Sequence, residues 1–282
     1  MNEITSDMIR ELRERTGVGM GKCKEALVLA EGDMEKAIDH LRKAGMAAGV
    51  KKEGRETKEG LILTGEDKHT LVIAEANAET DFVAQNDRFK HFLHDVVKQA
   101  LEAKPKSLED LVGQPYYKDH SITIDQYRNL VIQALGENIQ LRRVEAIHKH
   151  PNSSYGIYSH MGGKLVVVVE IEGASDQEAI AKEIAMHIAA ENPEYLKPEE
   201  IPAHALAREE EIARATVQGK PENIVEKIVS GKIKAYADQV CLIHQKYVKD
   251  NSVTVQQFLD ACSKKIGKAL SIRCFWRWKV GQ

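Results

Sequence analysis

A glycine-rich turn near the N-terminus is the first place where the sequence could do chemistry. Gly17-Val18-Gly19-Met20-Gly21-Lys22 ends in a lysine, as phosphate-binding loops do. Thr16 stands where the first glycine of such a loop belongs, and Cys23 replaces the hydroxyl residue that binds magnesium. A helical pattern, rather than a strand, precedes the turn. We interpret it as a connection between two helices with Met20 at its exposed tip, and keep a nucleotide-binding enzyme using Gly17 to Gly21 as an alternative.

Histidine and cysteine side chains are the next candidates, because they bind metals and act as nucleophiles. The chain has 11 histidines, among them the close pairs His91 with His94 and His148 with His150. Neither pair is accompanied by carboxylates or cysteines at metal-ligand spacing. The cysteines form no Cys-x-x-Cys pair and are typical of reduced thiols in a cytoplasmic protein. The sequence therefore predicts no catalytic side chains, no metal site and no cofactor.

The stretch Thr80-Asp81-Phe82-Val83 lies where a strand gives way to a helix. Residues 70–76 form a nearly unbroken apolar run, and apolar residues recur at helical spacing from Phe89 to Ala100. A carboxylate at Asp81 is favoured by the dipole at a helix start. The ring of Phe82 can either pack inward or be held out towards a partner, and the pattern leaves both open. Which of the two holds decides whether this turn is a core element or a contact site.

Composition excludes several classes of protein. A hydrophobic content of 43% and a charged content of 29% over 282 residues fit a soluble globular protein with more than one core. The 40 basic and 43 acidic residues give a net charge of −3, which argues against a large nucleic-acid surface. No apolar run is long enough to span a membrane, and the polar, acidic start of the chain is unlike a secretory signal. We expect a cytoplasmic protein that binds neither nucleic acid nor membrane.

Hydrophobic periodicity predicts an α+β protein made of several parts. Gly17 and Gly136 are expected to end helices, Asp33 to cap one, and Ser175 with Glu178 to form a capping box. The order strand, strand, helix occurs twice, which indicates two related subdomains. Six segments are expected: a three-helix docking module at 1–50, a charged linker at 51–60, a core N-subdomain at 61–138, the first part of a core C-subdomain at 139–195, an antiparallel helical hairpin at 196–240, and the return of the C-subdomain at 241–282.

Several motifs occur in an order that is more specific than any one of them. They are Leu12 to Met20, Glu79 to Ala84, Gly136 to Ile139 with Arg142-Arg143, Met186 to Ala190, and Gly219-Lys220-Pro221 before a helix. In this order they resemble the translation elongation factor Ts family, the nucleotide-exchange factors for elongation factor Tu, along nearly all the chain. The resemblance implies an N-terminal ubiquitin-associated-like three-helix module. It also implies a core of two related α/β subdomains with small antiparallel sheets and an inserted antiparallel coiled-coil hairpin.

The resemblance also implies which residues enter the nucleotide site of the partner. Asp81 and Phe82 match the positions that intrude near the magnesium ion and the phosphates of elongation factor Tu, with Thr80 and Val83 on either side of them. The partner would be bound both with GDP and without nucleotide. This chain would supply no cofactor and carry out no chemical step of its own. The alternative is a passive protein-binding module or chaperone.

Docking on the GTPase domain of the partner is implied for residues outside that stretch. Leu12 and Met20 match positions in the N-terminal module, and His160 matches a histidine that precedes a Gly-Gly-basic sequence. Gly21 stands where some relatives carry a second methionine. The chain ends at Gln282 without the longer C-terminal module that some relatives have. The helical hairpin could contact the partner or pair with a second copy as a homodimer.

Overall fold

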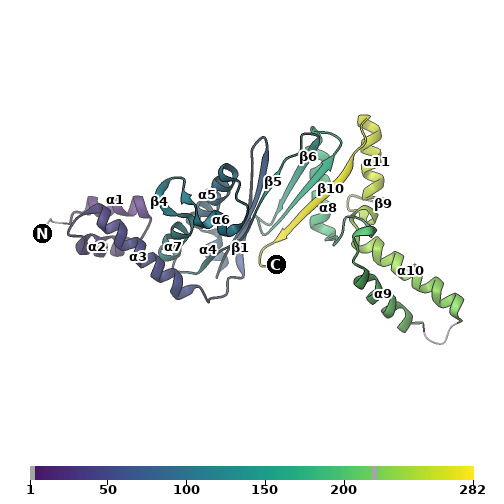
Figure 1. The fold of residues 1–282 in the computed structure, drawn as a ribbon, viewed down its shortest axis with the longest axis horizontal. Helices are drawn as coiled ribbons and strands as arrows, with labels where there is room; N and C mark the ends of the chain where they lie inside the picture. The colour runs from purple at the N-terminus through teal and green to yellow at the C-terminus, as the bar shows by residue number, and fades with distance from the viewer. Residues whose placement is uncertain (1–3, 218–220) are drawn as a thin grey trace. The chain divides into compact units, whose positions relative to one another are not determined.

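The computed structural model describes residues 4–217 and 221–282, which fold into two compact units of mixed helix and small antiparallel sheets (Figure 1). The first unit contains the residues up to Lys149 together with 162–164 and 279–282. The second contains His150–Met161 and Leu165–Trp278. The predicted α+β class is confirmed.

Three helices form the N-terminal module: α1 (Ser6–Thr16), α2 (Met20–Leu29) and α3 (Met34–Lys52). As expected, Gly17 ends α1 with a left-handed φ of 69°, and the Asp33 side chain caps α3 by accepting a hydrogen bond from the Lys36 N–H. The helices bury a small apolar core that includes Leu12, Leu27 and Leu41. Helix α3 runs two residues beyond the segment expected for the module, to Lys52.

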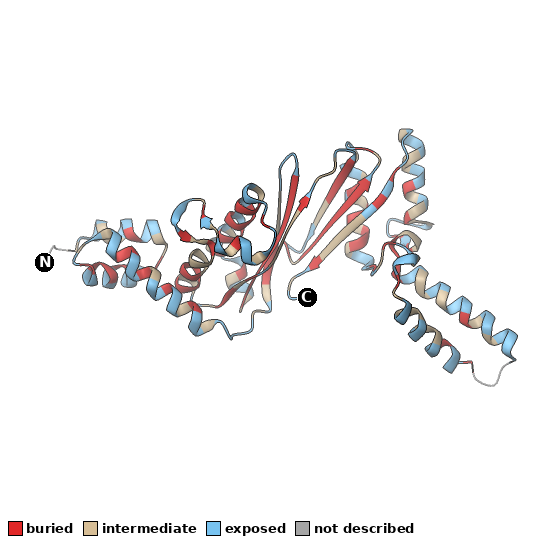
Figure 2. Ribbon diagram, viewed as in Figure 1, coloured by how far each residue is buried: buried red, intermediate tan, exposed pale blue. Residues whose placement is uncertain are grey.

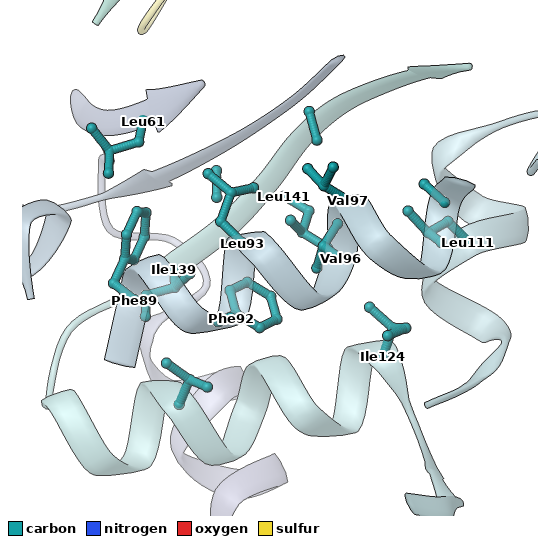
Figure 3. Packing of buried hydrophobic residues seen from close by; sticks show 14 of the residues in the cluster. Leu61, Phe89, Phe92, Leu93, Val96, Val97, Leu111, Ile124, Ile139 and Leu141 are labelled. Atoms are coloured by element: carbon teal, nitrogen blue, oxygen red, sulfur yellow. The ribbon is translucent and has the colours of Figure 1, made fainter. Parts of the chain in front are cut away.

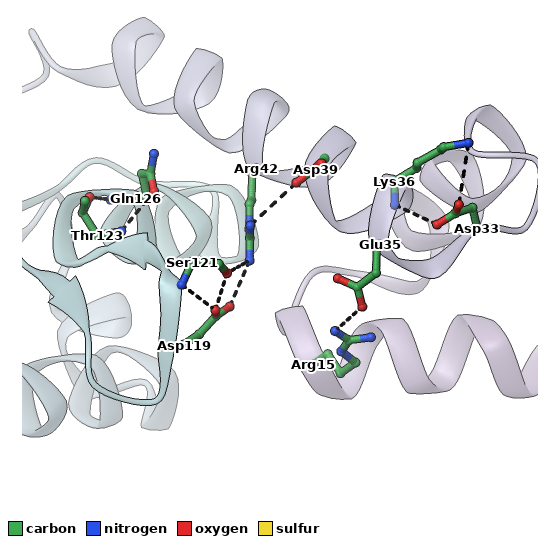
Figure 4. A network of polar contacts seen from close by, with 10 residues as sticks. All are labelled: Arg15, Asp33, Glu35, Lys36, Asp39, Arg42, Asp119, Ser121, Thr123 and Gln126. Carbon is green, nitrogen blue, oxygen red and sulfur yellow. Dashed lines mark hydrogen bonds and ion pairs between the residues drawn. The ribbon is translucent and has the colours of Figure 1, made fainter.

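The N-terminal module is joined to the rest of the first unit where α3 crosses α7 (Ile124–Leu135). A Cβ atom on Gly49 would lie 1.9 Å from the side-chain oxygen of Asn129, so a larger residue here would require the Asn129 amide to move. Arg42 strengthens the crossing by pairing with Asp119 at 3.0 Å and donating to Ser121 at 2.6 Å (Figure 4). The module is therefore packed on the rest of the first unit, which carries the Thr80 to Val83 stretch.

A three-stranded antiparallel sheet in the order β1-β2-β5 organises the first unit. Phe89, Phe92 and Val96 of α5 pack in the core that lies on this sheet (Figure 3). Strand β5 pairs with β2 from Thr70↔His148 to Ala78↔Ile139. Residues 139–148, which we expected to begin the second subdomain, thus belong to the first unit. The elements are β1 (Glu59–Glu66), β2 (Thr70–Ala78), α4 (Asp81–Gln85), α5 (Asp87–Ala103), α6 (Leu108–Gly113), β3 (Pro115–Tyr116), β4 (Asp119–Thr123), α7 and β5 (Ile139–His148).

The second unit has its own three-stranded sheet, in the order β10-β7-β6. The expected capping box at Ser175 and Glu178 is wrong, because α8 starts at Glu178 and has no side-chain cap. Ser154 from β6 accepts the hydrogen bond of the Gln177 N–H instead, at 2.8 Å. The elements are β6 (Ser153–His160), β7 (Leu165–Glu172), α8 (Glu178–Glu191), the 3-10 turns η1 (Pro198–Glu200) and η2 (Leu242–His244), α9 (Ala203–Ala215), α10 (Glu222–Val240), β8 (Lys246–Tyr247), β9 (Asp250–Thr254), α11 (Val255–Ile266) and β10 (Ser271–Lys279).

The two units share a hairpin-and-helix repeat that the sequence analysis missed. In each, a short hairpin leads into a helix that begins with a capping box, at Thr123 in α7 and at Thr254 in α11. In each, a carboxylate on the long preceding helix accepts hydrogen bonds from the tyrosine hydroxyl of the hairpin and lies within 3 Å of its lysine ammonium. The groups are Asp95 with Tyr116 and Lys118, and Glu183 with Tyr247 and Lys249. This observation supports two related cores.

Helices α9 and α10 lie side by side and project from the second unit (Figure 1). Along the sequence they separate α8 from the hairpin and helix of the second repeat. Most of their residues are exposed or only partly buried (Figure 2). The two chain segments at their base are joined by backbone hydrogen bonds, from Leu242 N to Tyr195 O at 2.9 Å and from Glu194 N to Val240 O at 2.9 Å. Of the expected stop signal between the helices, Gly219 and Lys220 lie outside the described residues, and Pro221 directly precedes α10.

His187 is a fully buried histidine that ties α8 to the base of this helical pair. The Val248 N–H donates to its Nδ1 at 3.1 Å, and its Nε2 lies 2.9 Å from the side-chain oxygen of Gln245. Gln245 in turn donates to the Gln239 carbonyl of α10 at 2.7 Å. Burial lowers the pKa of His187 below its ordinary value of 6.5.

The free energy of unfolding should decrease as pH falls below about 6.5, because the unfolded chain then takes up a proton at His187 that the folded chain excludes. The stabilising effect of the neutral ring is fully present above that pH. His187→Gln should flatten this pH dependence, and His120→Gln, at an exposed position, should not. Urea denaturation between neutral and mildly acidic pH measures both. If the free energy of unfolding depended equally on pH in the two variants, His187 would not be the group responsible.

Candidate partner-binding site

Phe82 holds its ring out into solvent, which answers the question that the sequence left open. It is the second residue of α4 and is 85% exposed, the largest value among the exposed large hydrophobic residues of the described chain. Asp81, directly before it, is also exposed. Val83 is half-buried against the core, and Ala84 is fully buried. The turn is therefore anchored by one side while its carboxylate and ring face outward.

Thr80 fixes the start of this turn. Its hydroxyl accepts a hydrogen bond from the Val83 N–H at 3.3 Å and so caps α4. The same hydroxyl donates to the carboxylate of Glu137 at 2.7 Å, and the Thr80 N–H donates to the second oxygen of that carboxylate at 3.0 Å. Thr80 thus acts within the chain, where it positions the two exposed residues that follow. Sequence reasoning singled out Thr80 but gave no role to Glu137, which directly follows the helix stop at Gly136.

Opposite charges surround the carboxylates beside the turn. Arg55 pairs with Glu79 at 3.4 Å. Burial lowers the pKa of the Lys52 ammonium at the end of α3, while the carboxylates of Glu79 and Glu137 act in the opposite direction. A residue of the N-terminal module therefore lies within electrostatic range of the carboxylate that holds Thr80.

Met20 and Leu12 differ sharply in exposure. Met20 is the first residue of α2 and is 40% exposed, so its side chain is available to a partner. Leu12 is 0% exposed and packs inside the N-terminal module. The prediction that Leu12 docks on a partner is therefore corrected, because its side chain offers no surface. Its place in the helical pattern could not distinguish the core of a small module from its docking face.

The beginning of α2 and the N-cap of α4 are both held at the C-terminal end of α7. The Lys22 ammonium lies 3.4 Å from the Gln133 carbonyl, and Glu137, just beyond the end of this helix, holds Thr80. Arg88 of α5 also donates to the Gly17 carbonyl between α1 and α2. Contacts within the first unit thus connect the segment carrying Met20 to the segment carrying Phe82.

His160 lies in the second unit, at the end of β6, and is exposed. Its Nδ1 is 3.1 Å from the Tyr158 hydroxyl, and the two rings stack with centroids 5.9 Å apart. Met161 follows with a left-handed φ of 50° and is 73% exposed. The tyrosine therefore fixes the orientation of an imidazole that other molecules can reach.

Metal-binding clusters and membrane-spanning helices are absent from the part of the chain that the structure describes. Within 4–217 and 221–282, no group of three or more His, Cys, Asp or Glu side chains could hold a metal ion. No helix in the described part of the chain is both long and apolar enough to cross a membrane. The glycine-rich turn connects α1 to α2, and its lysine contacts the Gln133 carbonyl. These contacts fit the interpretation of a connection between helices.

The model of the family described as Elongation factor TS matches residues 79–282. The chain belongs to the elongation factor Ts family. A protein named elongation factor Ts from Protochlamydia amoebophila is 55% identical over 282 residues, covering all of both chains. Proteins of the same name from Chlamydia felis and Chlamydia caviae are 41% and 42% identical over 281 residues, again covering 100% of both chains. In this chain, the α4 turn and all of the second unit lie inside the matched range.

Leu12→Ala should lower the free energy of unfolding of the N-terminal module by about 2–5 kcal/mol, because it leaves a cavity in a small core. Met20→Ala removes a partly exposed side chain and should cost less than about 1 kcal/mol. Hydrogen exchange of the α1 and α2 amides reports on both variants. A loss for Leu12→Ala no larger than that for Met20→Ala would show that Leu12 is not a core residue.

Proposed function

We propose that this chain is a guanine nucleotide exchange factor that binds GDP-bound elongation factor Tu and promotes GDP release, so that GTP can bind. The observation that carries the proposal is the 85% exposure of Phe82 on an anchored turn, in a chain of the elongation factor Ts family. An exposed phenylalanine ring on an anchored turn offers apolar area whose burial by a partner is favourable. Phe82 and Asp81 enter the nucleotide site of the partner, with Thr80 and Val83 on either side.

Exchange of this kind requires reciprocal coupling between two ligands. The factor lowers the affinity of the GTPase for nucleotide, and nucleotide lowers the affinity of the GTPase for the factor by the same ratio. Burying one phenylalanine supplies about 1.5–3 kcal/mol, and each 1.4 kcal/mol is roughly a factor of ten. Phe82 alone thus accounts for at most about a hundredfold. Any acceleration of GDP release beyond that factor comes from Asp81 and from binding energy at other contacts with the partner.

Docking involves both units. The N-terminal module is a ubiquitin-associated-like domain whose exposed Met20 contacts the GTPase domain, and His160 contacts it from the second unit. The pair α9 and α10 forms the coiled-coil hairpin of the family. Ile212 and Ile224 remain 49% and 44% exposed on it, which leaves apolar surface for the partner or for a second copy of the chain. The partner is bound both with GDP and without nucleotide.

Phe82→Ala should lower the maximal rate of GDP release from elongation factor Tu by about tenfold to a hundredfold, because the ring no longer fills the distorted site. Stopped-flow release of a fluorescent GDP analogue, measured over a range of factor concentrations, gives the maximal rate. Val248→Ala, which shortens a partly exposed apolar side chain in the second unit, is the matched control and should leave the rate unchanged. A wild-type rate for Phe82→Ala, with normal folding and binding, would rule this mechanism out. Binding without any effect of the wild-type chain on GDP release would favour the passive binding module.

Asp81→Ala should slow GDP release several-fold when magnesium is present, because the carboxylate competes with the phosphates for the ion. When a chelator removes magnesium from the GTPase beforehand, the variant and the wild type should release GDP at nearly the same rate. The same stopped-flow assay with and without chelator measures this difference. A defect of equal size in both conditions would mean that Asp81 does not act on the magnesium site.

A further inference from the structure

Beyond the last residue pair of β2 and β5, two side-chain carboxylates continue to link the two chain segments. The last pair of residues in the register is Ala78↔Ile139. In the next residues, the Asn138 N–H donates to the side chain of Glu79 at 2.7 Å, and the Thr80 N–H donates to the side chain of Glu137 at 3.0 Å. Each strand thus offers an acidic side chain to the backbone of the other, at the point where the chain turns into α4.

Helix α4 cannot maintain this geometry alone. It has five residues, and a helix of that length does not repay the cost of forming its first turn. Its direction must therefore be imposed by contacts with the rest of the unit: buried Ala84 on one side, and the residues that hold its first backbone groups. Glu137 is suited to this, because its half-buried carboxylate accepts both the N–H and the hydroxyl of Thr80, and hydrogen bonds to charged acceptors are the stronger kind.

The position of Glu137 is itself fixed by the end of α7. Gly136 ends this helix with a left-handed φ of 84°, and its N–H donates to the Ile132 carbonyl at 2.9 Å. Asn138 is buried, and its side chain donates to the Arg55 carbonyl at 2.9 Å. The segment that presents the carboxylate to Thr80 is therefore held on both sides of Glu137.

We propose that Glu137 is a positioning residue for nucleotide exchange, which holds Thr80 so that Asp81 and Phe82 point at the partner. It touches neither nucleotide nor magnesium. This inference rests on the proposed function and assigns a second residue to the same site. Since Glu137 orders the turn rather than supplying contact area, its removal lowers the rate of release within the complex more than it weakens the complex.

Glu137→Ala should reduce the maximal rate of GDP release about tenfold, while the half-saturating concentration of factor changes by less than about threefold. Thr80→Val, which keeps the shape but loses the hydroxyl, should produce a similar loss, and Thr80→Ser should stay near the wild-type rate. The double variant Glu137→Ala with Thr80→Val should lose less than the product of the two single losses, because either change already removes the hydrogen bond between the two side chains. Glu102→Ala, at an exposed carboxylate of α5, is the matched control.

A background lacking both exposed side chains, Asp81→Ala with Phe82→Ala, shows whether Glu137 acts through them. There Glu137→Ala should change the rate by less than about twofold. A loss of the usual size in this background, or additive losses for Glu137→Ala and Thr80→Val, would overturn the inference. Hydrogen exchange of the Val83 and Ala84 amides should be faster in Glu137→Ala and in the milder Glu137→Gln, and unchanged exchange would also overturn it.

Failure of this inference is distinguishable from failure of the proposed function. A normal rate for Glu137→Ala together with a slow rate for Phe82→Ala would remove the positioning role and leave the exchange mechanism intact. A normal rate for Phe82→Ala would remove the mechanism and with it the positioning role.

Discussion

The hydrogen bonds from Thr80 to the Glu137 carboxylate are the interaction on which the exposed turn with Asp81 and Phe82 depends. A five-residue helix has too few internal hydrogen bonds to persist in water, so its orientation comes from the contacts of its N-cap and of its buried side. The Thr80 hydroxyl accepts a hydrogen bond from the Val83 N–H of α4 and donates one to the Glu137 carboxylate. Buried Ala84 holds the opposite side. Between these two anchors, the Phe82 ring stays 85% exposed.

The rest of the first unit serves to place this turn. The core of α5 against the sheet fixes the end of β2, and the packing of α3 on α7 fixes the end of α7, from which Glu137 emerges. The same helix end contacts Lys22, so the N-terminal module and the turn share one support. The second unit repeats the arrangement of a long helix, a short hairpin and a capped helix. Its carboxylate, Glu183, binds a tyrosine and a lysine as Asp95 does.

Local features of the fold could be predicted from the sequence, and features that depend on distant neighbours could not. Gly17, Asp33 and Gly136 end or cap helices as expected, because such signals act over a few residues. The cap expected at Ser175 fails because Ser154, far away in sequence, takes its place. The hairpin repeat was missed because the helical pair α9 and α10 separates its halves. For the site, Asp81 and Phe82 could be selected but the exposure of the ring could not, and burial of Leu12 depends on helices folded around it.

The two chain segments at the base of α9 and α10 lie next to each other. Because Tyr195 and Leu242 are hydrogen-bonded to each other, the chain leaves the second unit and returns to it at nearly the same point. A segment bounded in this way can change in length, or carry a foreign domain at its far end, without moving the strands on either side. The connection between α9 and α10 is thus a natural place to splice in a fluorescent reporter, and a place where related genes can diverge in size while their cores stay alike.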